Sequence, residues 1–230
     1  NRIKGIYKAP KGNNFGTLTI NDSVGNENII GTATSDTLNL NAGNDTIDLG
    51  AGNDTVNVDI SNIDINDNIT DSSGLNDILN VTGSGTIDSA ALIDVSGFET
   101  LNLGSSDNTV TFDDTVEFNA FRNEFTNIVD AGGNDTLSFG TSAVTGDLDF
   151  SKLSDFENLN LSSADDNITL SGDEPINVNG EAGNDTFSLD FSNIDNFSID
   201  GGTNTTEDSV ALSGDTNSIS TDTEFGHASS

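Results

Sequence analysis

The sequence predicts an all-β solenoid, a coil of short strands, with one short helix laid over it. Near the start of the chain, acidic residues recur every nine positions, at Glu27, Asp36, Asp45 and Asp54, and an aliphatic residue follows two positions after each. Beyond them, short segments of alternating apolar and polar residues recur about every ten residues between turns of Gly, Asn, Asp and Ser. Hairpin sheets would give similar spacing, but internal repetition favours a solenoid.

The first repeating element is a run of four nonapeptides over 22–57: DSVGNENII, GTATSDTLN, LNAGNDTID and LGAGNDTVN. The last two read x-x-A-G-N-D-T-U-x, where U is aliphatic. They resemble the hemolysin-type calcium-binding nonapeptide G-G-x-G-x-D-x-U-x of the repeats-in-toxin (RTX) family. The resemblance implies a right-handed parallel β-solenoid (β-roll or β-helix), in which each nonapeptide supplies a metal-binding turn and a short strand. Residues eighteen apart then stack, and calcium is the implied cofactor, with several ions bound.

The expected calcium chemistry agrees with strand geometry. Adjacent strands lie about 4.7–4.9 Å apart, and calcium–oxygen bonds are about 2.3–2.6 Å long, so an ion between two stacked turns reaches a carboxylate from each. Stacking pairs Asp36 with Asp54, which is the favoured site, and Glu27 with Asp45. Glycine in the turn, at Gly43 and Gly52, is expected to adopt φ > 0 and to aim carbonyl oxygens inward as further ligands.

A longer repeat extends the candidate set. AGNDTVNVDISNID (51–64) recurs 131 residues later as AGNDTFSLDFSNID (182–195), and Asp77 and Asp208 keep the same offset. We therefore expect Asp54 to pair with Asp77, and Asp185 with Asp208, across coils with a longer loop. The predicted metal ligands are Glu27, Asp36, Asp45, Asp54, Asp77, Asp135, Asp185 and Asp208.

A second unit lies between these blocks. TIDSAALIDVSGFETLNLGSSDNTVTF (86–112) and DLDFSKLSDFENLNLSSADDNITL (147–170) share F-E-x-L-N-L followed by D-N-x-x-T. This unit resembles solenoid segments of type I secreted adhesins and of surface-layer proteins. The predicted strands are 98–103, 108–112, 135–139, 146–150, 156–161, 167–170, 176–180, 185–190, 196–200 and 208–213.

One segment breaks the strand rhythm. Phe118, Phe121 and Phe125 have helical spacing, which predicts a short amphipathic helix near 114–127 that covers the solenoid. An aromatic stripe of this kind is typical of core packing, and a cofactor groove is the less favoured alternative. The predicted organisation is a basic lead-in at 1–20, a nonapeptide calcium β-roll at 21–64, an irregular solenoid at 65–215 and a polar tail at 216–230.

The net charge of the chain indicates which classes of partner it attracts or repels. The chain has 39 acidic and 6 basic residues, for a formal charge of −33. Such a chain repels nucleic acid and anionic membranes and attracts divalent cations. Without calcium, the same composition is typical of a disordered chain. There is no cysteine, no apolar run long enough to span a membrane and no leader-like start, so a fragment of a longer secreted protein is expected.

Enzyme chemistry is not expected. The only histidine, His227, lies in the polar tail, and tryptophan is absent, so neither a triad nor a sugar platform is indicated. The sequence predicts a non-enzymatic calcium-binding structural module of a secreted bacterial cell-surface protein, of adhesin type. A surface-layer lattice subunit is the alternative, and an ice-binding solenoid is a lesser one. Expected partners are calcium and either further copies of the chain or other cell-surface components.

Overall fold

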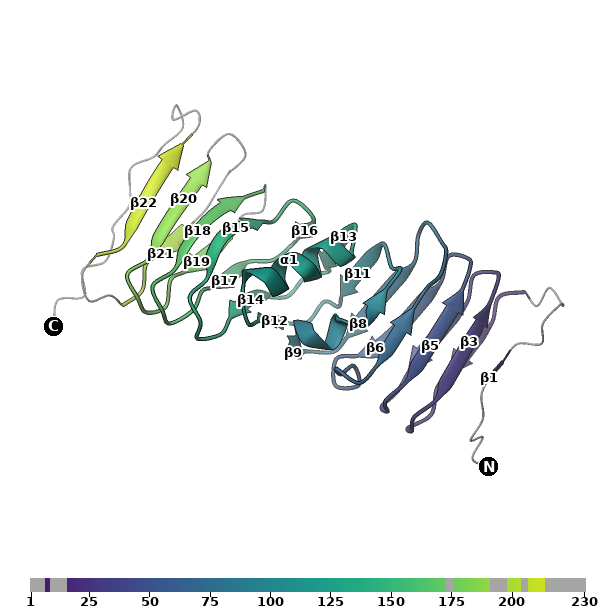
Figure 1. Ribbon diagram of the computed structural model, residues 1–230. Helices are drawn as coiled ribbons and strands as arrows, with labels where there is room; N and C mark the ends of the chain where they lie inside the picture. The colour runs from purple at the N-terminus through teal and green to yellow at the C-terminus, as the bar shows by residue number, and fades with distance from the viewer. Residues whose placement is uncertain (1–6, 9–15, 173–175, 191–197, 204–206, 214–230) are drawn as a thin grey trace.

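The computed structural model describes residues 7–8, 16–172, 176–190, 198–203 and 207–213, so most of the basic lead-in and the whole polar tail lie outside the described residues. Parallel strands form an elongated β-solenoid of about 8 turns, with a short helix near its middle (Figure 1). The predicted fold class is confirmed. In the described part of the chain, no helix is both long and apolar enough to cross a membrane.

Four parallel sheets make up the solenoid. The first contains β1 (Tyr7–Lys8), β3 (Asn28–Thr32), β5 (Thr46–Gly50), β7 (Asn68–Thr70) and β10 (Val95–Ser96). The second contains β2 (Thr19–Asn21), β4 (Thr37–Leu40), β6 (Thr55–Asp59), β8 (Ile78–Thr82), β11 (Thr100–Leu103), β13 (Asn127–Asp130) and β16 (Leu153–Ser154). The third contains β9 (Gly85–Asp88), β12 (Asn108–Phe112), β14 (Thr136–Phe139), β17 (Asn158–Asn160), β19 (Asn177–Asn179) and β21 (Ser198–Asp200). The fourth contains β15 (Thr145–Asp149), β18 (Asn167–Ser171), β20 (Thr186–Asp190) and β22 (Ser209–Ser213).

The order in which the chain visits these sheets changes along the molecule. From β2 to β8 it alternates between the first and second sheets, which gives two-sided coils. From β13 to β18 it visits the second, third and fourth sheets in turn, and from β19 it alternates between the third and fourth. The solenoid is therefore two-sided at each end and three-sided in the middle.

The core is built from columns of aliphatic side chains, one from each coil. In the second sheet, strand register places Leu38 on Val56, Val56 on Leu79, Leu79 on Leu101, and Leu101 on Ile128. All five side chains are fully buried. Alternate residues of a strand point to opposite faces, so the aliphatic residue two positions after each acid enters the core while its neighbours stay outside.

On the outer face of the same sheet, asparagine side chains form a ladder. Each amide donates to the amide oxygen of the preceding coil over 2.7–3.1 Å. The ladder runs through Asn21, Asn39, Asn57, Asn80 and Asn102. These uncharged bonds join five consecutive strands of the sheet without any need for an ion.

The predicted covering helix is α1 (Thr115–Glu124). Asp114 caps it by accepting a hydrogen bond from the Glu117 N–H at 2.9 Å. Phe118 and Phe121 point inward, and the Phe112 ring lies 5.3 Å from each of their rings. In chain order α1 follows the third sheet and precedes the second, the place that β15 occupies one coil later. A helix therefore substitutes for a strand in that coil.

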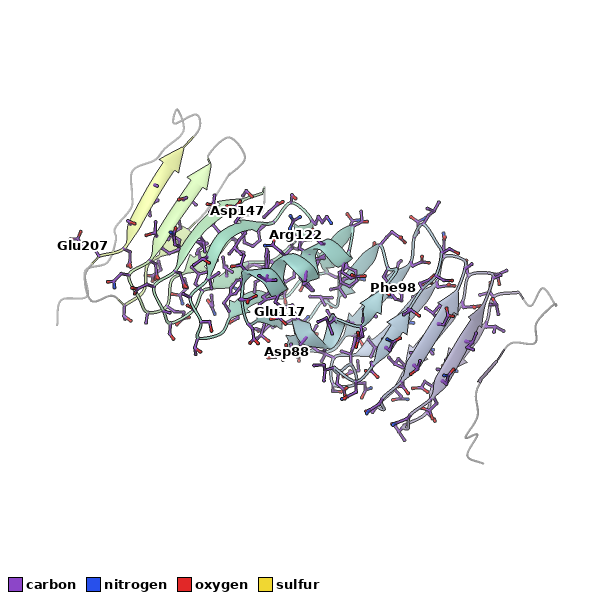
Figure 2. All side chains as sticks on the ribbon, viewed as in Figure 1. Asp88, Phe98, Glu117, Arg122, Asp147 and Glu207 are labelled. Atoms are coloured by element: carbon purple, nitrogen blue, oxygen red, sulfur yellow. The ribbon has the colours of Figure 1, made fainter. Side chains whose placement is uncertain are left out.

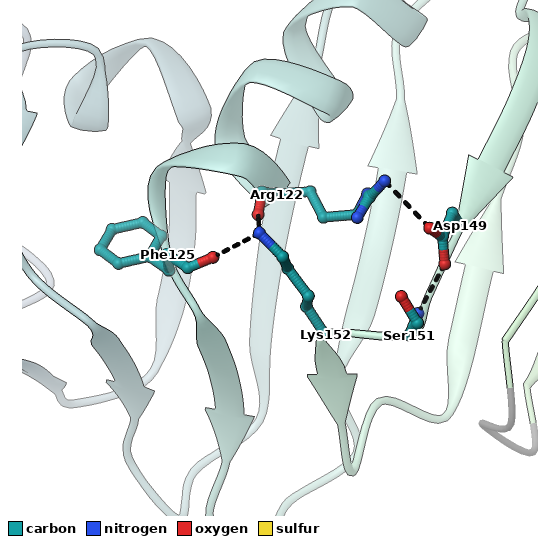
Figure 3. A network of polar contacts seen from close by, with 5 residues as sticks. All are labelled: Arg122, Phe125, Asp149, Ser151 and Lys152. Atoms are coloured by element: carbon teal, nitrogen blue, oxygen red, sulfur yellow. Dashed lines mark hydrogen bonds and ion pairs between the residues drawn. The ribbon is translucent and has the colours of Figure 1, made fainter.

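The two cations of residues 12–230 are both at this helix (Figure 3). Arg122 pairs with Asp149 at 2.9 Å, and Lys152 Nζ donates to the carbonyl oxygens of Arg122 at 3.2 Å and Phe125 at 2.9 Å. Burial would raise the pKa of Asp149, but hydrogen bonds from Ser151 and the nearby cations lower it overall. Lys152 thus satisfies carbonyl groups at the end of α1, where the helix dipole favours a positive charge.

Most predicted strands agree with the structure to within a few residues, and 108–112 agrees at both ends. The elements that were not predicted include β7, β8, β9 and β13, the two-residue strands β10 and β16, and the 3-10 helix η1 (Ser89–Leu92). Two residues of strand are too few to show an alternating pattern in a sequence.

Candidate metal centre

Stacked acids at the turns are joined by backbone hydrogen bonds between coils. The Asp36 N–H donates to Asp54 Oδ1 at 2.5 Å, and the Asp54 N–H donates to Asp77 Oδ1 at 2.6 Å. The Asp77 N–H continues the column to Glu99 Oε2 at 2.8 Å. The structure therefore brings the predicted pairs Asp36–Asp54 and Asp54–Asp77 together in one column.

A second column lies across the roll from the first. The Glu27 N–H donates to Asp45 Oδ1 at 2.8 Å, and the Asp45 N–H donates to Asp67 Oδ1 at 3.0 Å. The predicted pair Glu27–Asp45 is thus stacked, and Asp67 extends it. The nine-residue spacing of the repeat acids did not identify Asp67, because the coil that contains it is 22 residues long.

The later acids form two further columns. The Asp135 N–H donates to Glu157 Oε2 at 2.8 Å. The Asp166 N–H donates to Asp185 Oδ1, and the Asp185 N–H donates to Asp208 Oδ1, both at 2.9 Å. The structure therefore brings Asp185 and Asp208 together, as the 131-residue offset predicts.

In five of the stacked aspartates, one carboxylate oxygen accepts such a hydrogen bond and the other has no donor: Asp45, Asp54, Asp77, Asp135 and Asp185. A buried carboxylate oxygen without a partner costs free energy. Calcium binds carboxylate oxygens and would remove that cost. Buried oxygens with no hydrogen-bond partner occur in six of the eight predicted ligands: Glu27 Oε2, Asp45 Oδ2, Asp54 Oδ2, Asp77 Oδ2, Asp135 Oδ2 and Asp185 Oδ2.

A third acid completes two compact clusters. One contains Asp22, Glu27 and Asp45, and the other contains Asp54, Asp71 and Asp77. In each cluster, one oxygen from every residue lies within 4.8 Å of the others. Three converging carboxylate oxygens fit the binding of a hard divalent ion.

Asp22 and Asp71 were not among the metal ligands predicted from the sequence. Each directly follows a strand and precedes the repeat acid of the same turn, Asp22 by five residues and Asp71 by six. Each also has a buried oxygen with no partner. An acid five or six residues before a repeat acid is the signal that would have found them.

Asp36 has different surroundings from the other candidates. Its Oδ1 accepts from the Leu18 N–H at 2.8 Å, and its Oδ2 accepts from the Thr32 N–H at 2.7 Å. The Thr32 hydroxyl also donates to Asp36 Oδ1. Asp166 repeats this pattern, with Ser162 in the place of Thr32. Both oxygens of these two aspartates are satisfied by the protein itself.

Burial and mutual repulsion disfavour the charged state of the clustered acids. Desolvation, followed by the nearby charges, raises the pKa of Asp45 to about 7. Burial likewise raises the pKa of Asp71 to about 7, with Asp54 and Asp77 as further causes. The pKa of Asp77 is also raised, first by burial. A bound cation would reverse this preference by stabilising the ionised carboxylates.

The predicted positive φ at Gly43 is wrong. Positive φ occurs at Gly52, at 146°, but not at Gly43. Gly43 is required by close approach instead, because a Cβ there would overlap the Gly25 carbonyl oxygen. At Gly74 a Cβ would overlap both Asp77 Oδ2 and the Gly52 carbonyl oxygen. Glycine keeps open a space that carboxylate and carbonyl oxygens face together.

Comparison with known proteins gives one match. No curated protein and no solved structure matches the chain. Residues 23–56 match the family model of the RTX calcium-binding nonapeptide repeat, in 4 copies. The matched segment contains Glu27, Asp36, Asp45 and Asp54, at the turns just described. The resemblance that the sequence indicated is thus confirmed over residues 23–56, which match RTX calcium-binding repeats and lie within a parallel β-solenoid.

Proposed function

We propose that this chain is a calcium-binding structural module of a secreted bacterial cell-surface protein, of adhesin type, which folds when it meets external calcium. The observation that carries the proposal is the set of buried carboxylate oxygens without partners at the RTX turns. Proteins rarely bury such oxygens, and an ion at each cluster accounts for them. RTX β-solenoids are typically structural modules, which supports a non-enzymatic role.

The mechanism is electrostatic control of folding. Without calcium, three carboxylates in each cluster repel one another in a chain whose formal charge is −33. Calcium offsets this repulsion and joins acids of adjacent coils, Glu27 to Asp45 and Asp54 to Asp77. Because the ion binds the folded state, its binding free energy adds to stability. A calcium-poor cytosol would keep the chain loose for export, and a calcium-rich exterior would fold it.

Circular dichroism with calcium titration tests the proposal. We expect little β-structure in metal-free buffer and a cooperative gain at millimolar calcium. Magnesium at the same concentration is expected to substitute poorly, because it requires tighter octahedral geometry and loses water reluctantly. An identical spectrum with and without calcium would contradict calcium-dependent folding.

Imaging of the folded protein distinguishes the two surface roles. Electron microscopy in calcium is expected to show separate rods for an adhesin segment. Extended two-dimensional sheets would instead identify a surface-layer lattice subunit, in which copies of the chain or other surface components assemble laterally. Loss of such sheets on chelation would connect that assembly to the same ions.

A further inference from the structure

A third group of buried acids lies outside the RTX segment, in the coils next to α1. Asp130 is the last residue of β13, and Asp135 lies in the turn that leads to β14. Both side chains are fully buried, and the Oδ2 atom of each has no hydrogen-bond partner. Asp135 was predicted from the sequence, whereas Asp130 was not.

Backbone hydrogen bonds fix the other oxygen of each carboxylate. Asp130 Oδ1 accepts from the Gly132 N–H at 3.4 Å, and Asp135 Oδ1 accepts from the Asn108 N–H at 2.6 Å. The Oδ2 atoms are therefore the ones left for another ligand. Asp130 precedes Asp135 by five residues, which repeats the relation of Asp22 to Glu27.

The turn between the two acids is held open by glycine. A Cβ on Gly133 would lie 2.9 Å from the Ser106 carbonyl oxygen and 3.0 Å from Asp135 Oδ2. A carbonyl oxygen of the preceding coil thus approaches the same space as the unpartnered carboxylate oxygen. From the following coil, half-buried Glu157 accepts the Asp135 N–H at 2.8 Å.

Burial and nearby acids disfavour the charged forms of Asp130 and Asp135. Burial, then the charge of Asp135, raises the pKa of Asp130 to about 7. Burial also raises the pKa of Asp135, and Glu157 and Asp107 add to this effect. The two basic residues of 12–230 do not neutralise these acids. Arg122 pairs with Asp149, and Lys152 binds carbonyl oxygens of α1 and of the residue after it.

We propose that Asp130 and Asp135 hold a further calcium ion between the second and third sheets, with the Ser106 carbonyl as a neighbouring oxygen donor. This site rests on the proposed calcium-binding function and extends it beyond the RTX segment. All of the donors are oxygens, which suits calcium better than the metals that favour nitrogen or sulfur. The ion would connect the turn before α1, which contains Ser106, to the turn after it, which contains Asp130 and Asp135.

Calcium counting on variants of the full chain tests the site. Asp130→Asn keeps the oxygen that accepts from Gly132 but places an amide where the unpartnered oxygen was. We expect this variant to bind one calcium fewer than the wild type by native mass spectrometry at pH 8 and millimolar calcium. Asp135→Asn and the double variant should lose the same single ion, because partners in one site are not additive.

Two comparison variants separate this site from the others. Asp71→Asn should lose a different ion, so that Asp71→Asn with Asp130→Asn loses two. Asp88→Asn is the matched control, because Asp88 also accepts from the N–H two residues ahead, at 3.0 Å, but lies on the surface (Figure 2). It should keep the wild-type calcium count.

The outcomes are distinguishable. If Asp71→Asn loses an ion while Asp130→Asn keeps the full count, the further site is overturned and the proposed function stands. If the wild type binds no calcium, the proposed function itself fails. If the variants do not fold, crystals of the wild type grown in calcium decide: an anomalous peak between Asp130 and Asp135 supports the site, and its absence overturns it.

Discussion

Asp36 and Asp54 occupy equivalent places in successive coils, yet their carboxylates have different partners. The Thr32 N–H and hydroxyl and the Leu18 N–H all donate to Asp36. Asp54 accepts the Asp36 N–H on one oxygen, and its other oxygen faces Asp71 and Asp77 without a donor. Hydrogen-bond donors of the protein thus stabilise the Asp36 carboxylate, whereas the Asp54 carboxylate would be stabilised by a bound cation.

This contrast predicts opposite responses to calcium. Asp36→Asn should lower the free energy of unfolding by about 1–3 kcal/mol both with and without calcium, since a buried N–H loses its acceptor in either state. Asp54→Asn should destabilise the protein only in calcium, because in metal-free buffer it removes repulsion. Urea unfolding of both variants checks this, in calcium and in metal-free buffer that contains a stabilising osmolyte to fold the chain. A calcium-dependent loss for Asp36→Asn would instead support its predicted role as a ligand.

The regular spacing identified the repeat acids but not the neighbouring acids that lie beside them in each cluster. Glu27, Asp36, Asp45 and Asp54 were found because a strict period marks them, and stacking follows from that period. Asp22, Asp71 and Asp130 were not found because they lie at the end of the preceding strand or directly after it, and they recur at no fixed interval in the sequence. Glu99 and Glu157 were inside the F-E-x-L-N-L unit, but only the coil lengths of 22 residues place them under Asp77 and Asp135. Those lengths depend on loops whose size no local pattern shows.

At the scale of an element, the asparagine ladder is a source of cohesion that does not depend on metal. Asn57 donates to Asn39 at 2.9 Å and accepts from Asn80 at 2.9 Å. Asn57→Ala removes both bonds and leaves two partners unpaired. We expect it to lower the free energy of unfolding by about 1–3 kcal/mol, equally in calcium and in metal-free buffer containing a stabilising osmolyte.

The matched control for the ladder is Asn53→Ala. Asn53 is exposed in the turn before the same strand and outside the ladder. It should change stability by no more than about 0.5 kcal/mol. If Asn57→Ala were as mild as this control under urea unfolding, the ladder would have no measurable role.

The local sequence pattern predicted the helix but not its place in the solenoid. The phenylalanine spacing predicted α1, and the side chains of Phe118 and Phe121 are buried as expected. Phe125 is also buried, but it follows the helix rather than belonging to it. That the helix takes the place of a strand in a three-sided coil could not be predicted, because it depends on where sheets begin and end along the whole solenoid.

For the whole molecule, raised carboxyl pKa values predict a pH dependence. Burial raises the pKa of Asp45, Asp71 and Asp130 from 3.8 to about 7, and that of Asp185 to about 6. The folded state therefore binds more protons than the unfolded chain between these values. The stability that these acids contribute is fully present below about pH 4 and is lost as the pH rises through about 7.

We therefore expect the metal-free protein to be more stable near pH 5 than near pH 8. Saturating calcium should reverse the trend, because the ion binds deprotonated carboxylates. Urea unfolding gives the two profiles, one in calcium and one for stripped protein in a stabilising osmolyte that folds the metal-free chain. Metal-free stability that rises from pH 5 to pH 8 would show that these acids are not desolvated as the structure indicates.

The stacking of coils also determines how the molecule would respond to a pulling force. Acids joined by hydrogen bonds in adjacent coils are 18 to 23 residues apart in the chain. A folded coil advances the solenoid by about 4.8 Å, whereas 18 extended residues span at most about 60 Å. Each coil that peels from an end therefore releases more than ten times its folded length. Tethered at both ends, the solenoid would behave as an extensible link, and the ions between its coils would set the load at which it lengthens.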